Sequence, residues 1–225
     1  MSYEPGLLLL GVLPWDADGV VVDVGANRGQ SIDAVRRIRP DVRIEAFEAN
    51  PSLSRQLERR YADCPEIRVH HCGLGDLAGN FTLHVPVYRR HAFDGLAALD
   101  AADAADEFHE WVYGFSEGHL SLQQVECRLG VLDDMDLKPV FVKIDVEGHE
   151  LAVLRGARRT LAAFEPVVMV EAIESGEEVA SLLGELGYER CELSELLPGA
   201  GGPPGPNLLF VTPARRATLA GNPGV

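Results

Sequence analysis

The sequence predicts a doubly wound α/β fold with a mostly parallel sheet. Two observations lead to this prediction: short β-branched runs alternate with amphipathic stretches, and glycine, proline or polar clusters separate them. Of the 225 residues, 46% are hydrophobic and 24% are charged, as expected for one well-packed domain of ordinary size. We therefore expect a single domain over residues 1–213 and a frayed C-terminal tail over 214–225.

The expected strands are short apolar runs, and several of them end in polar residues. They span 20–24, 42–47, 67–70, 140–145, 167–170, 188–193 and 208–211, with additional short strands at 81–85 and 125–129. The expected helices have apolar residues at helical spacing, or a proline or glycine at one boundary; they span 31–39, 50–61, 150–164 and 177–186. The apolar segment 6–13 is expected to pack ahead of the sheet as a strand or helix.

Charge and cysteine content exclude several classes of partner. The formal net charge is −15, which repels phosphate backbones and anionic membrane surfaces, so neither nucleic acid nor a membrane is expected as a partner. No apolar run is long enough to span a bilayer. The four cysteines are far apart and form no C-x-x-C pair, which favours reduced thiols in a cytoplasmic protein. Association into oligomers is compatible with the sequence.

A glycine-bearing loop follows the first expected strand. Ligands of doubly wound sheets bind outside the carboxyl ends of the strands, where this loop lies. Its glycines are Gly25 and Gly29, and Asn27 occupies the position where a dinucleotide fingerprint has its second glycine. The loop therefore suits a nucleoside-like ligand without a pyrophosphate. Asp23, at the strand end, is placed to pair with a cationic ligand group.

Two further acids follow neighbouring strands. Glu48 ends the second strand, where an acid hydrogen-bonds the hydroxyls of a ribose. Asp76 follows the third strand, and two interpretations stay open for it. It accepts a hydrogen bond from an adenine amino group, or it is a turn residue before the next strand.

The segment 142–150 concentrates charge around the end of a buried strand. Burying such charge is costly unless it is paired or used in chemistry. For Lys143 the simpler interpretation is an ion pair with one of these acids. Asp145, Glu147 and His149 are the candidate catalytic group, with His149 ranked first as a base by its intrinsic pKa. The alternative for His149 is a helix-start residue that faces the backbone.

A second mechanism uses a divalent cation. Asp145, Glu147 and Glu171, which lies on the same rim, provide the oxygen ligands that magnesium or calcium prefers. A metal is nevertheless not the favoured expectation.

Residues 86–124 interrupt the alternation of strands and helices. An aromatic cluster over 108–115 lies among polar residues. We interpret this segment as a substrate lid, with Trp111, Tyr113 and His119 as substrate residues together with Glu171. An ordinary packed insertion is the alternative.

Several segments taken in order resemble the FkbM-type methyltransferases. They are Asp-Val-Gly-Ala-Asn-Arg-Gly-Gln at 23–30, Phe-Glu-Ala-Asn-Pro at 47–51, Lys-Ile-Asp-Val-Glu-Gly-His-Glu at 143–150, Val-Leu-Arg-Gly-Ala at 153–157 and Val-Glu at 170–171. The resemblance implies a Rossmann-like sheet of seven strands with an antiparallel last strand, bound S-adenosylmethionine, and O-methylation. Acceptors in this family are typically hydroxyls on natural products, sugars or lipids.

The resemblance also implies roles for single residues. Asp23, Gly25, Asn27 and Gly29 would line the methionine end of the cofactor, Glu48 would hold the ribose, and Asp145 would lie beside the sulfonium. We add Ala26, Ala49 and Asp76 to the expected cofactor-binding set.

The expected function is therefore transfer of a methyl group from S-adenosylmethionine to a hydroxyl of a small molecule such as a natural product, a sugar or a lipid-linked glycan. Two alternatives stay open. A nicotinamide-dependent oxidoreductase is weakened by Asn27 in the loop. A non-catalytic cofactor-binding protein of the same fold would keep the site without turnover.

Overall fold

The computed structural model describes residues 4–15, 18–112, 116–171, 175–200 and 207–220. Its main sheet has seven strands in the order β10-β11-β9-β8-β1-β2-β3. They are β1 (Val20–Val24), β2 (Arg43–Phe47), β3 (Ile67–His70), β8 (Pro139–Ile144), β9 (Val167–Glu171), β10 (Glu189–Cys191) and β11 (Asn207–Val211). All neighbours pair in parallel except those of β11, which is antiparallel to β9 and β10. The predicted fold class and the antiparallel last strand are confirmed.

Helices cover both faces of this sheet, because successive side chains of a strand point to opposite faces. Val167 and Met169 of β9 pack into one hydrophobic cluster, and Val168 and Val170 pack into another. The first cluster includes residues of the 3-10 helix η1 (Pro5–Gly11), α1 (Gln30–Ile38), α2 (Pro51–Arg60), α7 (Leu193–Leu196) and α8 (Pro213–Ala220). The second includes residues of α4 (Glu150–Arg155), α5 (Arg158–Phe164) and α6 (Gly176–Glu185).

The helix predicted over 150–164 is two helices, α4 and α5, that meet at Gly156. A Cβ atom at Gly156 would lie 2.0 Å from the carbonyl oxygen of Gly75, so this position must be glycine. The Gly156 carbonyl accepts a hydrogen bond from the backbone N–H of Asp133 instead of continuing one helix. Tertiary contacts therefore end α4 where the apolar periodicity alone predicts continuation.

The C-terminal part of the chain is more ordered than predicted. The strand expected over 188–193 ends at Cys191, and a capping box of Glu192 and Glu195 begins α7. Residues 214–220 of the predicted frayed tail belong to α8 (Pro213–Ala220), which buries Leu219 in the core. Residues 221–225 lie outside the described part of the chain.

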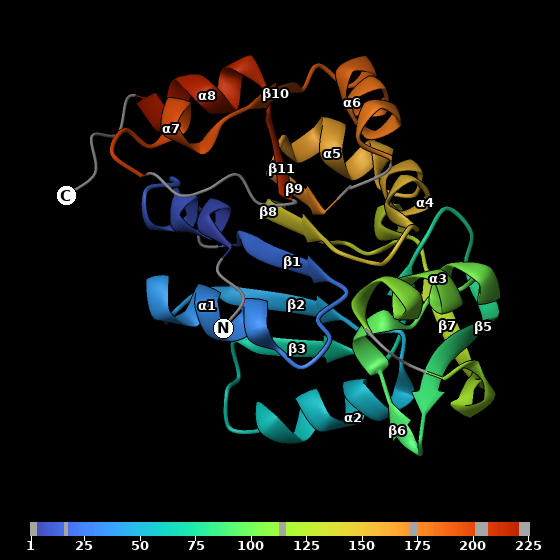
Figure 1. Cartoon of the computed structure of the whole chain (residues 1–225). Coiled ribbons are helices and arrows are strands. Elements are labelled where there is room, and N and C mark those ends of the chain that lie inside the picture. The colour runs from blue at the N-terminus through green and yellow to red at the C-terminus, as the bar shows by residue number, and fades with distance from the viewer. Residues whose placement is uncertain (1–3, 16–17, 113–115, 172–174, 201–206, 221–225) are drawn as a thin grey trace.

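A second, four-stranded sheet in the order β4-β7-β5-β6 lies beside the carboxyl ends of β1, β2 and β3 (Figure 1). It contains β4 (Gly73–Leu74), β5 (Gly79–Tyr88), β6 (His91–Ala92) and β7 (Leu120–Gly130). The strands predicted at 81–85 and 125–129 are the middle of a long antiparallel pair, β5 with β7. Between β6 and β7 the chain forms η2 (Asp94–Leu96), α3 (Ala101–Trp111) and η3 (Glu117–His119), and a last 3-10 turn, η4 (Leu132–Asp134), precedes β8.

The described part of the segment 86–124 is thus a structured extension of a second sheet, placed where ligands of doubly wound sheets bind. In the part of the chain that the structure describes, no helix has the length and apolar character needed to cross a membrane.

Candidate active site

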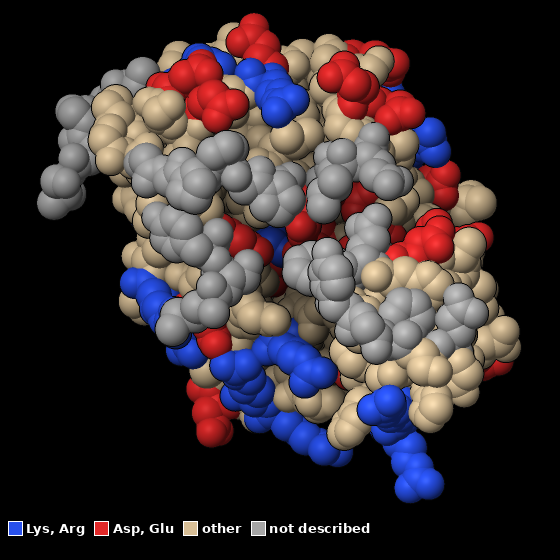
Figure 2. Space-filling model, viewed as in Figure 1, with Lys and Arg blue, Asp and Glu red and all other residues tan. Residues whose placement is uncertain are grey.

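A cavity lies at the carboxyl ends of β1, β2, β8 and β9, between the main sheet and the second sheet. Figure 2 shows acidic side chains gathered in the hollow of this face. The described residues that line it come from the strand ends and from the segment after β6; they are Gly25, Asn27, Phe47, Glu48, Ala49, Asn50, Gly73, Leu74, Leu83, Asp94, Gly95, Ala97, Ala98, Leu99, Leu129, Asp145, Val146, Glu147, His149 and Glu171. Candidate residues from distant parts of the sequence therefore meet in one site.

The glycine loop after β1 passes directly over the end of β8. Gly25 has a φ of +82°, and a Cβ atom there would lie 1.8 Å from the carbonyl oxygen of Asp145. The backbone N–H groups of Gly25 and Ala26 both donate to the carbonyl oxygen of Phe47, at 3.0 and 3.1 Å. Glycine is required at position 25 because two backbone segments touch. The same contact brings Asn27 and Asp145 to one cavity.

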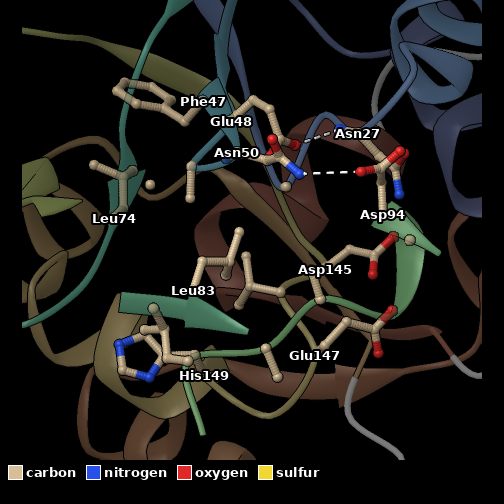
Figure 3. A pocket seen from close by; sticks show the side chains of 18 of the residues that line it. Asn27, Phe47, Glu48, Asn50, Leu74, Leu83, Asp94, Asp145, Glu147 and His149 are labelled. Atoms are coloured by element: carbon tan, nitrogen blue, oxygen red, sulfur yellow. Dashed lines mark hydrogen bonds between the residues drawn. The ribbon is translucent and has the colours of Figure 1, made fainter. Parts of the chain in front are cut away.

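Glu48 ties this loop to the end of β2 (Figure 3). Its Oε2 accepts a hydrogen bond from the Asn27 N–H at 2.8 Å, and its Oε1 accepts one from the Asn50 N–H at 2.7 Å. Burial raises the pKa of Glu48 to about 7, although both backbone hydrogen bonds oppose the rise. Glu48 and its neighbour Ala49 both line the cavity, as expected for residues of a cofactor site.

Four of the expected cofactor residues do not line the cavity. Ala26 is buried in the core, and Asp76 is exposed on the surface. Gly29 precedes α1, and a Cβ atom there would meet the Tyr61 hydroxyl at 2.4 Å. Asp23 is buried and accepts a hydrogen bond from the Ser31 hydroxyl at 2.5 Å, so it anchors the first turn of α1.

A buried cluster of charges lies beneath the cavity. The Nζ of Lys143 is 2.8 Å from Oδ2 of Asp145 and 3.6 Å from Oε1 of Glu4, and Lys143 pairs with Asp23 in the register of β8 and β1. Burial alone lowers the pKa of Lys143, but these carboxylates outweigh it and raise the pKa above its usual range. The predicted ion pair of Lys143 is confirmed, and it holds Asp145 at the cavity.

Glu171, the last residue of β9, forms a side-chain hydrogen bond with Asp145. Burial raises the pKa of Glu171 to about 8, and the charge of Asp145 and a hydrogen bond with it add to the rise. A pKa of about 8 places much of Glu171 in its protonated form at neutral pH, and Asp145 also accepts a hydrogen bond from Nζ of Lys143. Both acids line the cavity, so a ligand there can contact the titratable Glu171.

His149 lies apart from the two acids with which the sequence groups it. In Figure 3 the Asp145 and Glu147 carboxylates point toward the end of the cavity where Asp94 lies, and the His149 ring points toward Leu74. His149 is the N-cap residue of α4, and burial lowers its pKa. Its ring is therefore neutral at neutral pH. Glu147 precedes α4 in a turn with a φ of +47°.

The metal alternative stays a prediction. Among the described residues, no three His, Cys, Asp or Glu side chains are grouped so as to hold a metal ion, and Asp145, Glu147 and Glu171 are no exception. The Asp145 side chain already forms hydrogen bonds with Lys143 and Glu171.

The lid expected from aromatic residues has a different composition. His119 is exposed, does not line the cavity and contacts the Tyr88 ring, with ring centroids 6.2 Å apart. Phe108 is fully buried against Tyr88 and Phe93, within the segment itself. Tyr113 lies outside the described residues, as does the side chain of Trp111.

The part of the insertion that lines the cavity is 94–99, which the sequence analysis missed. Most of these residues are small or aliphatic and carry no chemical signal. Only the Asp94-Gly95 pair gives one, as a turn dipeptide.

The seven-stranded sheet, the glycine loop after β1 and the acid after β2 are the features with which doubly wound folds bind a nucleoside-containing ligand. The methyltransferase FkbM domain model matches residues 23–190, and the chain belongs to this family. The family match favours the methyltransferase prediction over the nicotinamide-dependent alternative.

Three known proteins illustrate the similarity. The chain is 28% identical to Methyltransferase 1 of Beauveria bassiana, covering 64% of this chain and 61% of that protein. It is 32% identical to the AMB antimetabolite synthetase AmbE of Pseudomonas aeruginosa, covering 64% of this chain and 8% of the synthetase. The chain thus spans less than two thirds of either relative. The crystal structure of the methyltransferase FkbM from Methylobacillus flagellatus has the same fold, with a TM-score of 0.55 at 19% identity, covering 89% of this chain and 45% of that one.

Proposed function

We propose that this chain transfers the methyl group of S-adenosylmethionine to a hydroxyl oxygen of a small molecule. The observation that carries the proposal is the meeting of two sets of residues in one cavity: Gly25, Asn27 and Glu48 on one wall, and the hydrogen-bonded Asp145 and Glu171 on another. The first set suits a nucleoside, and the second suits a group that must lose a proton. Bound S-adenosylmethionine supplies an electrophilic methyl group on a sulfonium.

The residues present fit this cofactor. The side-chain oxygen of Asn27 is buried and has no hydrogen-bond partner among the described residues, so it is available to a donor on a ligand. Each Glu48 oxygen accepts one backbone N–H and keeps a further lone pair for a ribose hydroxyl. Gly25 leaves the loop without a side chain where the ligand approaches. These three residues would hold the nucleoside part.

The acceptor hydroxyl must lose its proton as its oxygen attacks, and a positioned base contributes typically about 10²–10⁴-fold to such a step. Glu171, with a pKa of about 8, is close to its titration point near neutral pH. Asp145 is fixed beside it by Lys143. We therefore assign proton acceptance to Glu171 with Asp145, ahead of His149, and place Glu147 beside them as a contact for the acceptor.

Charge restricts the acceptor. Five acidic side chains line the cavity, from Glu48, Asp94, Asp145, Glu147 and Glu171, and its described lining contains no lysine or arginine. An anionic group brought into this site would be desolvated without a cationic partner. The part of the acceptor that enters is therefore uncharged or cationic, and the chain's net charge of −15 also favours a small molecule over a nucleic acid.

Transfer of an isotopic label tests the proposal. The protein is incubated with S-adenosylmethionine carrying ¹³C in its methyl group and with a set of alcohols, phenols and sugars, each paired with an analogue that lacks the hydroxyl. The carbon chemical shift of the product distinguishes a methyl group on oxygen from one on nitrogen or carbon. Label on oxygen, absent with the deoxy analogues, supports the proposal, and label on nitrogen or carbon alone contradicts it.

Glu171→Gln is expected to flatten the pH dependence of transfer. Glu171 loses its proton as the pH rises through about 8, so kcat/KM of the wild-type protein should rise through that pH. Glutamine cannot accept the proton, and kcat/KM at higher pH should fall by about 10²–10⁴-fold. The affinity for S-adenosylhomocysteine should change little. A variant that keeps the wild-type pH profile would remove Glu171 from this role, and His149→Asn serves as the comparison that should keep it.

Glu48→Gln is expected to weaken binding of S-adenosylhomocysteine by about tenfold or more, because the buried carboxylate accepts two backbone N–H bonds that one amide oxygen cannot both satisfy. Titration calorimetry measures the change. Glu45→Gln, on the same strand and outside the cavity, is the matched control and should bind normally. Equal affinities for the two variants would exclude Glu48 from the cofactor site.

A further inference from the structure

The 3-10 turn η2 reaches from the insertion to the cofactor loop. The side chain of Asp94, the first residue of η2, lines the cavity and is 19% exposed. Its Oδ2 accepts a hydrogen bond from Nη2 of Arg28 at 3.1 Å, and its Oδ1 accepts one from Nδ2 of Asn50 at 3.3 Å. Next to it, a Cβ atom at Gly95 would lie 3.2 Å from Nδ2 of Asn27. At the cavity, the turn therefore contacts the segments that follow β1 and β2.

The partners of Asp94 belong to the two segments that Glu48 joins. Arg28 follows Asn27, and the N–H groups of Asn27 and Asn50 both donate to the Glu48 carboxylate. Asn50 also caps α2 through its side-chain oxygen and Ser52. Figure 3 shows the Asn50–Asp94 bond beside the Asn27–Glu48 bond. Asp94 thus joins the same two segments from the insertion side.

We call residues 93–98, which include η2, the strap. Backbone hydrogen bonds fix both of its ends to β5. The N–H of Phe93 donates to the carbonyl oxygen of Pro86 at 2.8 Å, and Ala98 forms a bridge with His84 through two backbone hydrogen bonds of 2.7 and 3.1 Å. Between these two anchors the strap crosses the cavity, which Gly95, Ala97 and Ala98 line. Its ends are therefore held by backbone hydrogen bonds, and among the described residues its side-chain hydrogen bonds to the segments after β1 and β2 come from Asp94.

We propose that Asp94 is a positioning residue that fastens the strap 93–98 over the bound cofactor through Arg28 and Asn50. The inference rests on the proposed function, because it takes this cavity as the cofactor site. It gives the insertion a role in retaining the cofactor as well as in shaping the acceptor site. Release of the cofactor requires the Asp94 contacts to break, whereas its entry into a site with an unfastened strap does not.

The dissociation rate of S-adenosylhomocysteine, measured by stopped flow, tests the proposal. Asp94→Ala is expected to raise this rate about tenfold, since a hydrogen bond to a charged group is lost, while the association rate stays within twofold or so. Arg28→Gln should act in the same direction. The double variant should be little worse than either single variant, because both break one contact. Asp106→Asn and Arg59→Gln, exposed residues on α3 and α2, are the matched controls.

Hydrogen exchange of the amides over 93–98 gives a second readout. In the complex with S-adenosylhomocysteine these amides should exchange faster in Asp94→Ala than in the wild-type protein or in Asp106→Asn. Unchanged dissociation and exchange in both Asp94→Ala and Arg28→Gln would overturn the proposal, as would fully additive effects in the double variant. Failure of the wild-type protein to bind S-adenosylhomocysteine would instead contradict the proposed function.

Discussion

Lys143→Met is expected to cost about 3–5 kcal/mol of unfolding free energy, because it removes one partner of a buried ion pair. Lys143 is 2% exposed and is the cation that faces Glu4, Asp23 and Asp145. Two of these acids already have a buried oxygen with no hydrogen-bond partner among the described residues, Oε2 of Glu4 and Oδ1 of Asp23. Without the ammonium group the carboxylates repel one another in a largely buried cluster. Urea unfolding at neutral pH measures the loss.

The loss of unfolding free energy in Lys143→Met should depend on pH in a defined direction. Burial raises the pKa of Glu4 and of Asp23, and removal of the nearby cation raises both further. A carboxyl group whose pKa is raised on folding favours the folded state at low pH and loses that contribution as the pH rises through its folded-state pKa. The penalty of Lys143→Met should therefore shrink toward acidic pH and grow toward neutral pH.

Two variants complete this test. Lys138→Met removes an exposed lysine that pairs with exposed Asp18, and it should cost less than about 1 kcal/mol. Combining Lys143→Met with Asp145→Asn removes both charges of the ion pair whose Nζ and Oδ2 atoms are 2.8 Å apart. The double variant should recover part of the lost unfolding free energy. A loss of less than about 1 kcal/mol for Lys143→Met, equal to that of Lys138→Met, would mean that the buried cluster has no ionic character.

Gly25→Ala is expected to destabilise the fold and to abolish binding of S-adenosylhomocysteine. Its φ of +82° costs an alanine about 1–2 kcal/mol, and contact of the new Cβ atom with the Asp145 carbonyl adds about 1–3 kcal/mol of overpacking. The loop and the end of β8 must then move apart. That movement displaces Asn27 and Asp145, which both line the cavity. Urea unfolding and titration calorimetry measure the two effects separately.

Gly187→Ala is the control, because it isolates the backbone contribution. Gly187 has nearly the same φ, +81°, but a Cβ atom there would meet nothing within 4 Å. It should cost only the conformational strain of about 1–2 kcal/mol and should leave ligand binding intact. If both variants lose the same stability and both still bind S-adenosylhomocysteine, the close approach of the loop to β8 has no part in the site.

The main sheet could be predicted from the sequence because its strands are bounded apolar runs. Val20–Val24 and Ile67–His70 begin and end where the pattern predicts. The pattern fails where a tertiary contact decides the boundary. The break between α4 and α5 depends on Gly75 lying against Gly156, and α8 depends on the burial of Leu219. Neither neighbour is visible in the local sequence.

The site was predictable in part for the same reason. Gly25, Asn27, Glu48 and Asp145 all follow strands, and parallel strands place their ends along one edge. Side-chain direction was not predictable: Asp23 points toward Ser31, and the His149 ring lies at the far end of the cavity from the Asp145 carboxylate. The strap was missed because Gly95, Ala97 and Ala98 act through backbone position, whereas the conspicuous aromatic Phe108 serves as internal core.

A calorimetric titration of the wild-type protein with S-adenosylhomocysteine, and separately with NAD, tests the central claim most directly. We expect one S-adenosylhomocysteine to bind per chain and NAD not to bind. Ligand at 100 times its Kd should also raise the unfolding free energy by about 2.7 kcal/mol. Binding of NAD with no heat from S-adenosylhomocysteine would contradict the assignment of the Gly25 loop and Glu48 to the methyl donor.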